Sequence, residues 1–134
     1  MIEPILQQVC YHDGRGPELQ AVRYANQGRS IQAVEYFNPD DVSTPQNIKH
    51  LHFIKPQVFM FTPEEVYNCQ PGESYWAQFR PAAIISLGKS AWLDSFDQQH
   101  LTQCYHFQIM FYDQYLDIIC EEIVSGQGVY QSAV

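Results

Sequence analysis

The stretch "CYHFQIMFYDQYLDIICEE", residues 104–122, decides the fold class because apolar and polar residues largely alternate on both sides of a polar break. Alternation with a period of two is typical of β-strands, and the break at Asp113 and Gln114 is typical of a turn, so the stretch predicts a β-hairpin. With Asp113 and Gln114 as the two central turn residues, His106 lies opposite Glu121.

The two faces of this hairpin differ in polarity, and the apolar one is expected to pack into a core. That face consists of Tyr105, Phe107, Ile109, Phe111, Leu116, Ile118, Cys120 and Glu122. The other face carries His106, Gln108, Met110, Tyr112, Tyr115, Asp117, Ile119 and Glu121. There, Glu121 would either orient His106 as a general base or only stabilise strand pairing on an exposed surface, by roughly a few tenths of a kcal/mol. The second role is the commoner one for surface pairs.

Three further extended segments and two short helices follow from the remaining sequence. The extended segments are "IQAVEYF" at 31–37, "HLHFIKPQVFMFT" at 50–62 and "FRPAAIISLG" at 79–88. One helix is predicted in "TPEEVYNC", where Thr62 caps the start and Glu65 completes a capping box. The other is "AWLDSF", with Ser90 as its N-cap.

Together these elements predict a single globular domain, residues 1–134. Its fold class is α+β, dominated by an antiparallel β-sheet of about four to six strands with about two or three short helices, and a small β-barrel or sandwich is the alternative. Residues 1–30 form either a strand between loops or a loosely held arm, and residues 125–134 are expected to fray.

Charge and hydropathy limit the classes of partner. Seven Lys and Arg residues stand singly against 15 Asp and Glu, and the net charge is -8, so nucleic acid is not an expected partner. Charged residues make up 16% of the chain against about 25% in typical domains, and a surface rich in uncharged polar groups suits a protein partner. No membrane span or positively charged leader is visible, so we expect a soluble, cytoplasmic protein.

Motifs for covalent chemistry or cofactor binding are not found in the sequence. The four cysteines are widely spaced, form no C-x-x-C pair and are expected to be reduced and buried. No serine lies in a G-x-S-x-G motif. The segment "SLGKS" at 86–90 is not a phosphate loop, because Ala83 stands where that motif requires glycine. We therefore expect no cofactor.

The histidines are the candidates for metal or ligand binding. His50 and His52 share one side of an extended segment, which is the spacing that two imidazoles need to reach one ion. No third ligand lies at a diagnostic spacing, so no metal is predicted. An enzyme would have to join these two residues with His106 and Glu121 around one pocket.

Glu35 is a further ligand candidate, because alternation places it on the same face as the apolar Ile31, Ala33 and Phe37. A carboxylate in that position lies either at a solvated sheet edge or in a pocket that raises its pKa. The edge is the more common situation, since buried unpaired acids are rare.

Aromatic residues supply the candidates for a binding surface. The run "VFMF" at 58–61 is apolar on both faces, so a partner would cover one side if the domain itself does not, and Phe59 and Phe61 belong to it. Tyr75 and Trp76 fall in a predicted loop, where exposed aromatic side chains would serve as anchors for a partner.

Three segments, "FTPEEVYN", "GKSAWLDSF" and "HLTQCYHFQIMFYDQYLDIICEEI", resemble small, acidic, uncharacterised proteins of cyanobacterial type. The resemblance covers roughly the last two thirds of the chain. It implies a stand-alone domain and transfers no functional residue.

The favoured hypothesis is a non-enzymatic binding or protein-interaction domain that meets a protein partner or forms a homo-oligomer through a sheet face or edge. It depends on the "VFMF" run and on the lack of a catalytic motif. The alternative is a small metal- or ligand-binding enzyme that uses the His/Glu cluster.

Overall fold

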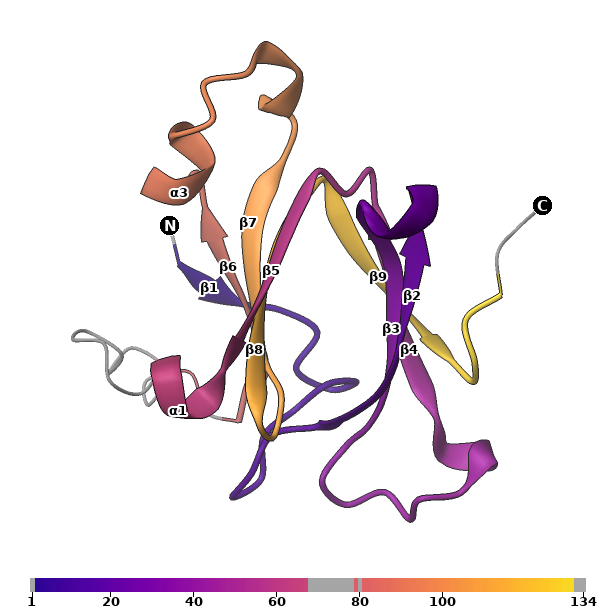
Figure 1. Ribbon diagram of the computed structural model, residues 1–134. Coiled ribbons are helices and arrows are strands. Elements are labelled where there is room, and N and C mark those ends of the chain that lie inside the picture. The colour runs from indigo at the N-terminus through magenta and orange to yellow at the C-terminus, as the bar shows by residue number, and fades with distance from the viewer. Residues whose placement is uncertain (1, 68–78, 80, 132–134) are drawn as a thin grey trace.

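A computed structural model describes residues 2–67, 79 and 81–131, and shows two antiparallel β-sheets that face each other (Figure 1). The first sheet has five strands in the order β1-β6-β7-β8-β5. They are β1 (Glu3–Pro4), β5 (Val58–Pro63), β6 (Ile84–Gly88), β7 (Tyr105–Met110) and β8 (Gln114–Cys120). The second has four strands in the order β2-β3-β4-β9. They are β2 (Glu18–Ala25), β3 (Ser30–Phe37), β4 (Lys49–Ile54) and β9 (Glu122–Gln127).

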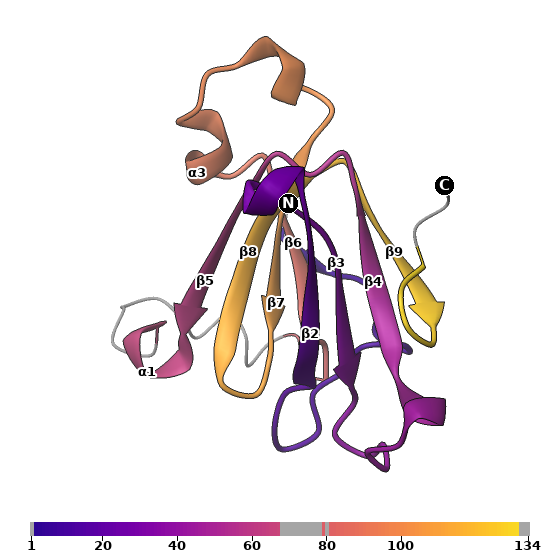
Figure 2. The same cartoon turned by 45° about the vertical axis from the view of Figure 1, so that its right-hand side comes forward.

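The helices in the described part of the chain are short. They are α1 (Glu64–Tyr67), α3 (Ala91–Asp94) and the 3-10 turns η1 (Asn26–Gly28), η2 (Pro45–Asn47) and η3 (Gln99–Leu101). None has the length and apolar character that crossing a bilayer requires. Figure 2 shows α3 and the segment after it extending beyond one end of the two sheets.

The prediction of a fold dominated by antiparallel sheet with a few short helices is confirmed in this coarse form. The nine strands of the described residues are divided between two sheets that do not close into a barrel. The sequence favoured one sheet of about four to six strands, with a small barrel or sandwich as the alternative. Two sheets form because each presents an apolar face to the other. The main core draws on both: Ile31, Val34, Tyr36, Leu51, Phe53 and Ile123 from one sheet, and Ile84, Phe107, Ile109, Leu116, Ile118 and Cys120 from the other.

The hairpin of β7 and β8 has the predicted faces but a different register. His106 lies opposite Ile119, so the predicted His106–Glu121 pair is wrong. The turn closes one residue earlier than expected, with the Phe111 N–H donating to the Gln114 carbonyl at 2.9 Å. Gln114 is a strand residue because it pairs with β5. The resulting offset of two residues changes each cross-strand partner while leaving the side chains of β7 and β8 on their predicted faces.

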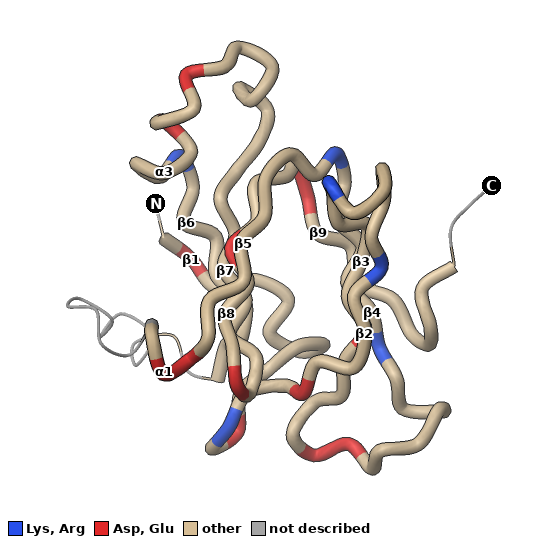
Figure 3. Tube along the Cα trace, in the orientation of Figure 1, with Lys and Arg blue, Asp and Glu red and all other residues tan. Residues whose placement is uncertain are grey.

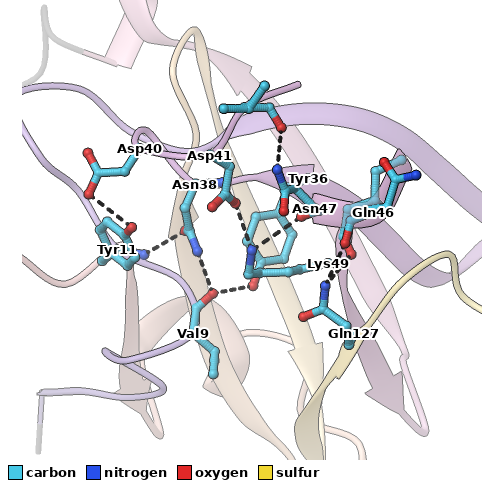
Figure 4. Close-up of polar contacts among 12 residues, drawn as sticks. Val9, Tyr11, Tyr36, Asn38, Asp40, Asp41, Gln46, Asn47, Lys49 and Gln127 are labelled. Carbon is cyan, nitrogen blue, oxygen red and sulfur yellow. Dashed lines mark hydrogen bonds and ion pairs between the residues drawn. The ribbon is translucent and has the colours of Figure 1, made fainter. Parts of the chain in front are cut away.

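The N-terminal segment is held to the rest of the domain by hydrogen bonds. Two side chains donate to the Val9 carbonyl, the Tyr36 hydroxyl at 2.6 Å and the Asn38 amide at 2.9 Å, and the Tyr11 N–H donates to Asn38 Oδ1 at 3.1 Å (Figure 4). β1 pairs with β6, and the segment that the sequence left open as a strand or an arm contains β2.

Candidate functional site

The five ligand candidates from the sequence do not form one cluster. Glu35, His50 and His52 lie on the outer face of the four-stranded sheet, because their neighbours Val34 and Leu51 point into the core. His106 and Glu121 lie elsewhere: His106 is on the outer face of the five-stranded sheet, and Glu121 stands between β8 and β9. Among the residues that the structure describes, no three or more His, Cys, Asp or Glu are placed to hold a metal ion.

Glu35 is buried, with 2% of its surface exposed, and it is paired. Its carboxylate accepts hydrogen bonds from Arg23 Nε at 3.1 Å, Arg23 Nη2 at 2.8 Å and the Tyr130 backbone N–H at 2.9 Å. Burial raises the pKa of Glu35, but these hydrogen bonds and the guanidinium charge outweigh burial and lower it below its ordinary value. Glu35 therefore occupies neither a solvated edge nor a pocket that raises its pKa, contrary to both sequence-based alternatives.

His50 and His52 contact the C-terminal segment through Tyr130. The Tyr130 ring centroid lies 5.6 Å from that of His50 and 4.9 Å from that of His52. His50 Nδ1 carries hydrogen and donates to the Gly128 carbonyl at 2.9 Å, since a carbonyl only accepts. Glycine at position 126 leaves room for the imidazole, because a Cβ there would collide with it. These contacts, together with Glu35, fasten residues 128–130 to the sheet.

A shallow hollow of about 610 Å³ lies beside these rings, lined by His50, His52, Val124 and residues 127–131. Burial and the neighbouring His50 lower the pKa of His52, which favours its neutral form. We call Arg23, Glu35, His50, His52 and Tyr130 the His50 cluster. Its charged groups pair with each other and its rings pack together, so its evident effect is to hold the C-terminal segment.

The pH dependence of stability is expected to report the Glu35 interaction. A carboxylate whose folded pKa is lowered stabilises the fold above its unfolded pKa, about 4.5, and this stabilisation is lost as the pH falls through the folded pKa. The difference in unfolding free energy between wild type and Glu35→Gln should therefore shrink on acidification below about pH 4.5. Urea unfolding over a pH series measures it, and a difference that is constant with pH would contradict the assignment.

The polar face of the hairpin is buried, whereas an exposed surface was expected. His106, Gln108 and Asp117 are 6%, 3% and 5% exposed. The Trp92 ring packs 4.9 Å from the His106 ring, and Leu93, which follows it in α3, packs with Ile119. The segment between β6 and β7 therefore covers one end of this face.

Four side chains here form what we call the His106 network: Ser90, His106, Gln108 and Asp117. His106 Nε2 lies 2.6 Å from Asp117 Oδ1, and Gln108 Nε2 donates to the same oxygen at 3.0 Å. Ser90 Oγ lies 2.8 Å from His106 Nδ1. For a neutral imidazole we assign the hydrogen to Nε2, so that Nδ1 accepts from the Ser90 hydroxyl.

Sequence reasoning identified only His106 from this network as a candidate site residue. A turn placed one residue earlier would have set Asp117 diagonally across from His106, within reach of its ring. Ser90 was recognised as a helix cap, and its Oγ does accept from the Leu93 N–H at 3.2 Å. Its contact with His106 joins separate segments, so the local pattern gave no sign of it.

The interaction candidates Phe59 and Phe61 lie in β5, and Tyr75 and Trp76 lie outside the described residues. Both phenylalanines pack against the main core, while the Met60 between them is 46% exposed. The Phe59 ring also lies 6.1 Å from that of Tyr24 in β2. β5 is an edge strand, and among the described residues its only strand partner is β8.

Comparisons with protein-family models, with curated proteins and with solved structures find no match to this chain. The functional argument therefore depends on the contacts of its own residues.

Proposed function

We propose that this protein is a protein-interaction domain that binds a partner strand along the free edge of β5. The observation that supports this proposal is the character of that edge. β5 pairs with β8 over six residues without a register shift, and its sequence "VFMFTP" contains no charged residue. An uncharged, regular edge strand presents unpaired backbone groups that readily pair with another strand.

The other three edges of the described sheets carry features that oppose such pairing. β1 has only two residues. The pairing of β2 with β3 has two register shifts, and β2 carries the charged residues Glu18 and Arg23. β9 begins with Glu122 and contains Gly126, which weakens an extended strand. Short length, bulges, charge and proline are the usual devices that protect a sheet edge, and of these β5 has only Pro63 at its end.

A second copy of the chain is the partner that fits this edge most simply. Two β5 strands that meet antiparallel place no like charges opposite each other, because the strand has none. Pro63 has no N–H to donate, so continuous pairing is limited to residues 58–62. Met60, exposed beside the edge, would add apolar contact across the pair.

In Figure 3 the Lys and Arg positions lie in the four-stranded sheet and in loops, and no strand of the five-stranded sheet, β5 included, contains one. A metal- or ligand-binding enzyme built from His50, His52, His106 and Glu121 has less support, because those residues lie on different surfaces of the sandwich.

Met60→Lys is expected to weaken self-association, because the new lysines of the two copies would lie close to each other across a two-fold pair of β5 strands and repel. The dimer dissociation constant should rise by about tenfold or more, which corresponds to about 1.4 kcal/mol. Sedimentation velocity over a concentration series measures this constant.

Val124→Lys in β9 is the matched control, because Val124 is also an apolar edge-strand residue and is 42% exposed. Its dimer should persist. A wild-type chain that remains monomeric at high concentration, or equal weakening by both lysines, would contradict self-pairing through β5.

A further inference from the structure

The His106 network supports an activity separate from edge pairing. We propose that Ser90 is a nucleophile, activated by His106 and oriented through Asp117, that accepts the acyl group of a small carboxylic ester. The three side chains are joined in sequence by contacts of 2.8 Å and 2.6 Å. A hydroxyl, an imidazole and a buried carboxylate in this order are the parts that activate a serine for acyl transfer.

Burial differs along the network in the way that this chemistry requires. His106 and Asp117 have side chains only 8% and 7% exposed, so water does not compete for their hydrogen bond. Gln108 holds the carboxylate from a second side. Ser90 is half-buried and lies at the end of the network nearest solvent. The base is therefore held within the protein, and Ser90 is the least buried residue of the network.

The backbone around Ser90 is a strand–turn–helix connection. β6 ends at Gly88, whose φ of 62° is a left-handed conformation suited to glycine, and α3 begins at Ala91. This turn directs Ser90 toward β7, where His106 stands. Because the hydroxyl comes from a turn and the base from the sheet, their juxtaposition depends on the fold of the whole sheet.

The two imidazole nitrogens have exchanged roles relative to the best-known serine triads. There the carboxylate holds Nδ1 and the hydroxyl faces Nε2, whereas here Asp117 holds Nε2 and Ser90 faces Nδ1. Either nitrogen of a neutral imidazole accepts a proton while the other keeps its own. The proton path is therefore preserved.

The reaction balances with water as the only co-reactant. Ser90 Oγ bonds to the ester carbonyl carbon as its proton moves to His106 Nδ1, and the carbon–oxygen bond to the alcohol breaks as the alcohol takes that proton. Water then attacks the acyl-serine, His106 accepts a water proton and returns it to Ser90 Oγ, and the carboxylic acid leaves.

The surroundings of Ser90 indicate the class of ester. A hollow of about 470 Å³ is lined by Lys89, which precedes Ser90, and by Leu93 and later residues of the same segment, while Ser90 itself is not among its lining residues. Lys89 Nζ donates to the carbonyls of Thr102 and Cys104, so its charge is engaged within the protein. Asp94 and Asp97 also line the hollow and would repel anions. Small esters with an uncharged acyl group are therefore the substrate class that we infer.

Labelling with a fluorophosphonate tests the proposal, because this reagent joins its phosphorus to an activated serine oxygen with loss of fluoride. The full-length chain is treated with the probe, and intact-protein and peptide mass spectrometry locate the adduct. We expect one adduct, on Ser90, that is lost in Ser90→Ala. Ser95→Ala is the matched control, since Ser95 lies on the same segment and its hydroxyl donates only to the Trp92 carbonyl.

Asp117→Asn tests the positioning role and should slow labelling by roughly 100-fold or more. Hydrolysis of p-nitrophenyl acetate by the same variants provides a second readout. A folded wild-type chain without an adduct on Ser90, or with labelling unchanged in Ser90→Ala, would overturn the proposal, whether or not Asp117→Asn folds. Because the oligomeric state is measured separately, the test does not depend on edge pairing.

Discussion

Asp117→Ala is expected to destabilise the folded chain by about 2 to 6 kcal/mol, because two buried donors lose their acceptor and each unsatisfied donor costs about 1 to 3 kcal/mol. The substitution takes the acceptor away from His106 Nε2 and removes one bond from Gln108, at a site where water has little access. The buried imidazole would then have to shift or admit water. Urea unfolding at neutral pH measures the loss.

Asp113→Ala is the control for this prediction, because Asp113 lies in the turn of the same hairpin and is exposed. Its free energy of unfolding should change by no more than about 0.5 kcal/mol. If Asp117→Ala cost less than about 1 kcal/mol, the His106–Asp117 contact would contribute little to the buried face of the sheet.

Phe53→Ala is also expected to cost about 3 to 5 kcal/mol. Phe53 is 1% exposed and belongs to the core between the two sheets, so its removal leaves a cavity that both sheets would have to close. Thermal and urea unfolding measure the effect, and Val124→Ala on the adjacent β9 is its surface control. A loss below about 1 kcal/mol would mean that the two sheets do not share a packed core around Phe53.

The apolar face of the hairpin could be predicted because each side chain of a strand points to one of only two faces of the sheet. Phe107, Ile109, Leu116 and Ile118 all point into the core as expected. The register was not predictable from alternation, since an offset of two residues preserves both faces. It is set by the turn and by β5, which recruits Gln114 into a strand.

Glu35 shows how one irregularity reverses a sequence pattern. Alternation placed it with Ile31, yet Ile31 is in the main core and Glu35 is on the outer face. Between β2 and β3, Arg23 pairs with Ala33 while Tyr24 pairs with Ile31, so Gln32 is an extra residue. A β-bulge at that point changes the phase of the strand, and the sequence carries no local mark of it.

The burial of the polar hairpin face depends on a segment that precedes it in the chain. The helix capped by Ser90 was predicted, but its position over β7 follows from packing of Leu93 and Leu101 with Ile119. The Ser90–His106 contact is a consequence of that packing. Sequence patterns therefore predicted the elements, while the network between them required the three-dimensional arrangement.

Amide hydrogen exchange at β5 tests the central claim, that this edge pairs with a second copy, most directly. Exchange is followed for peptides covering Val58–Pro63 and Glu122–Gln127 at low and high protein concentration. Edge pairing predicts that protection of the β5 amides rises with concentration while that of the β9 amides stays constant. β5 exchange that is the same at every concentration, in a chain that remains folded, would contradict the claim.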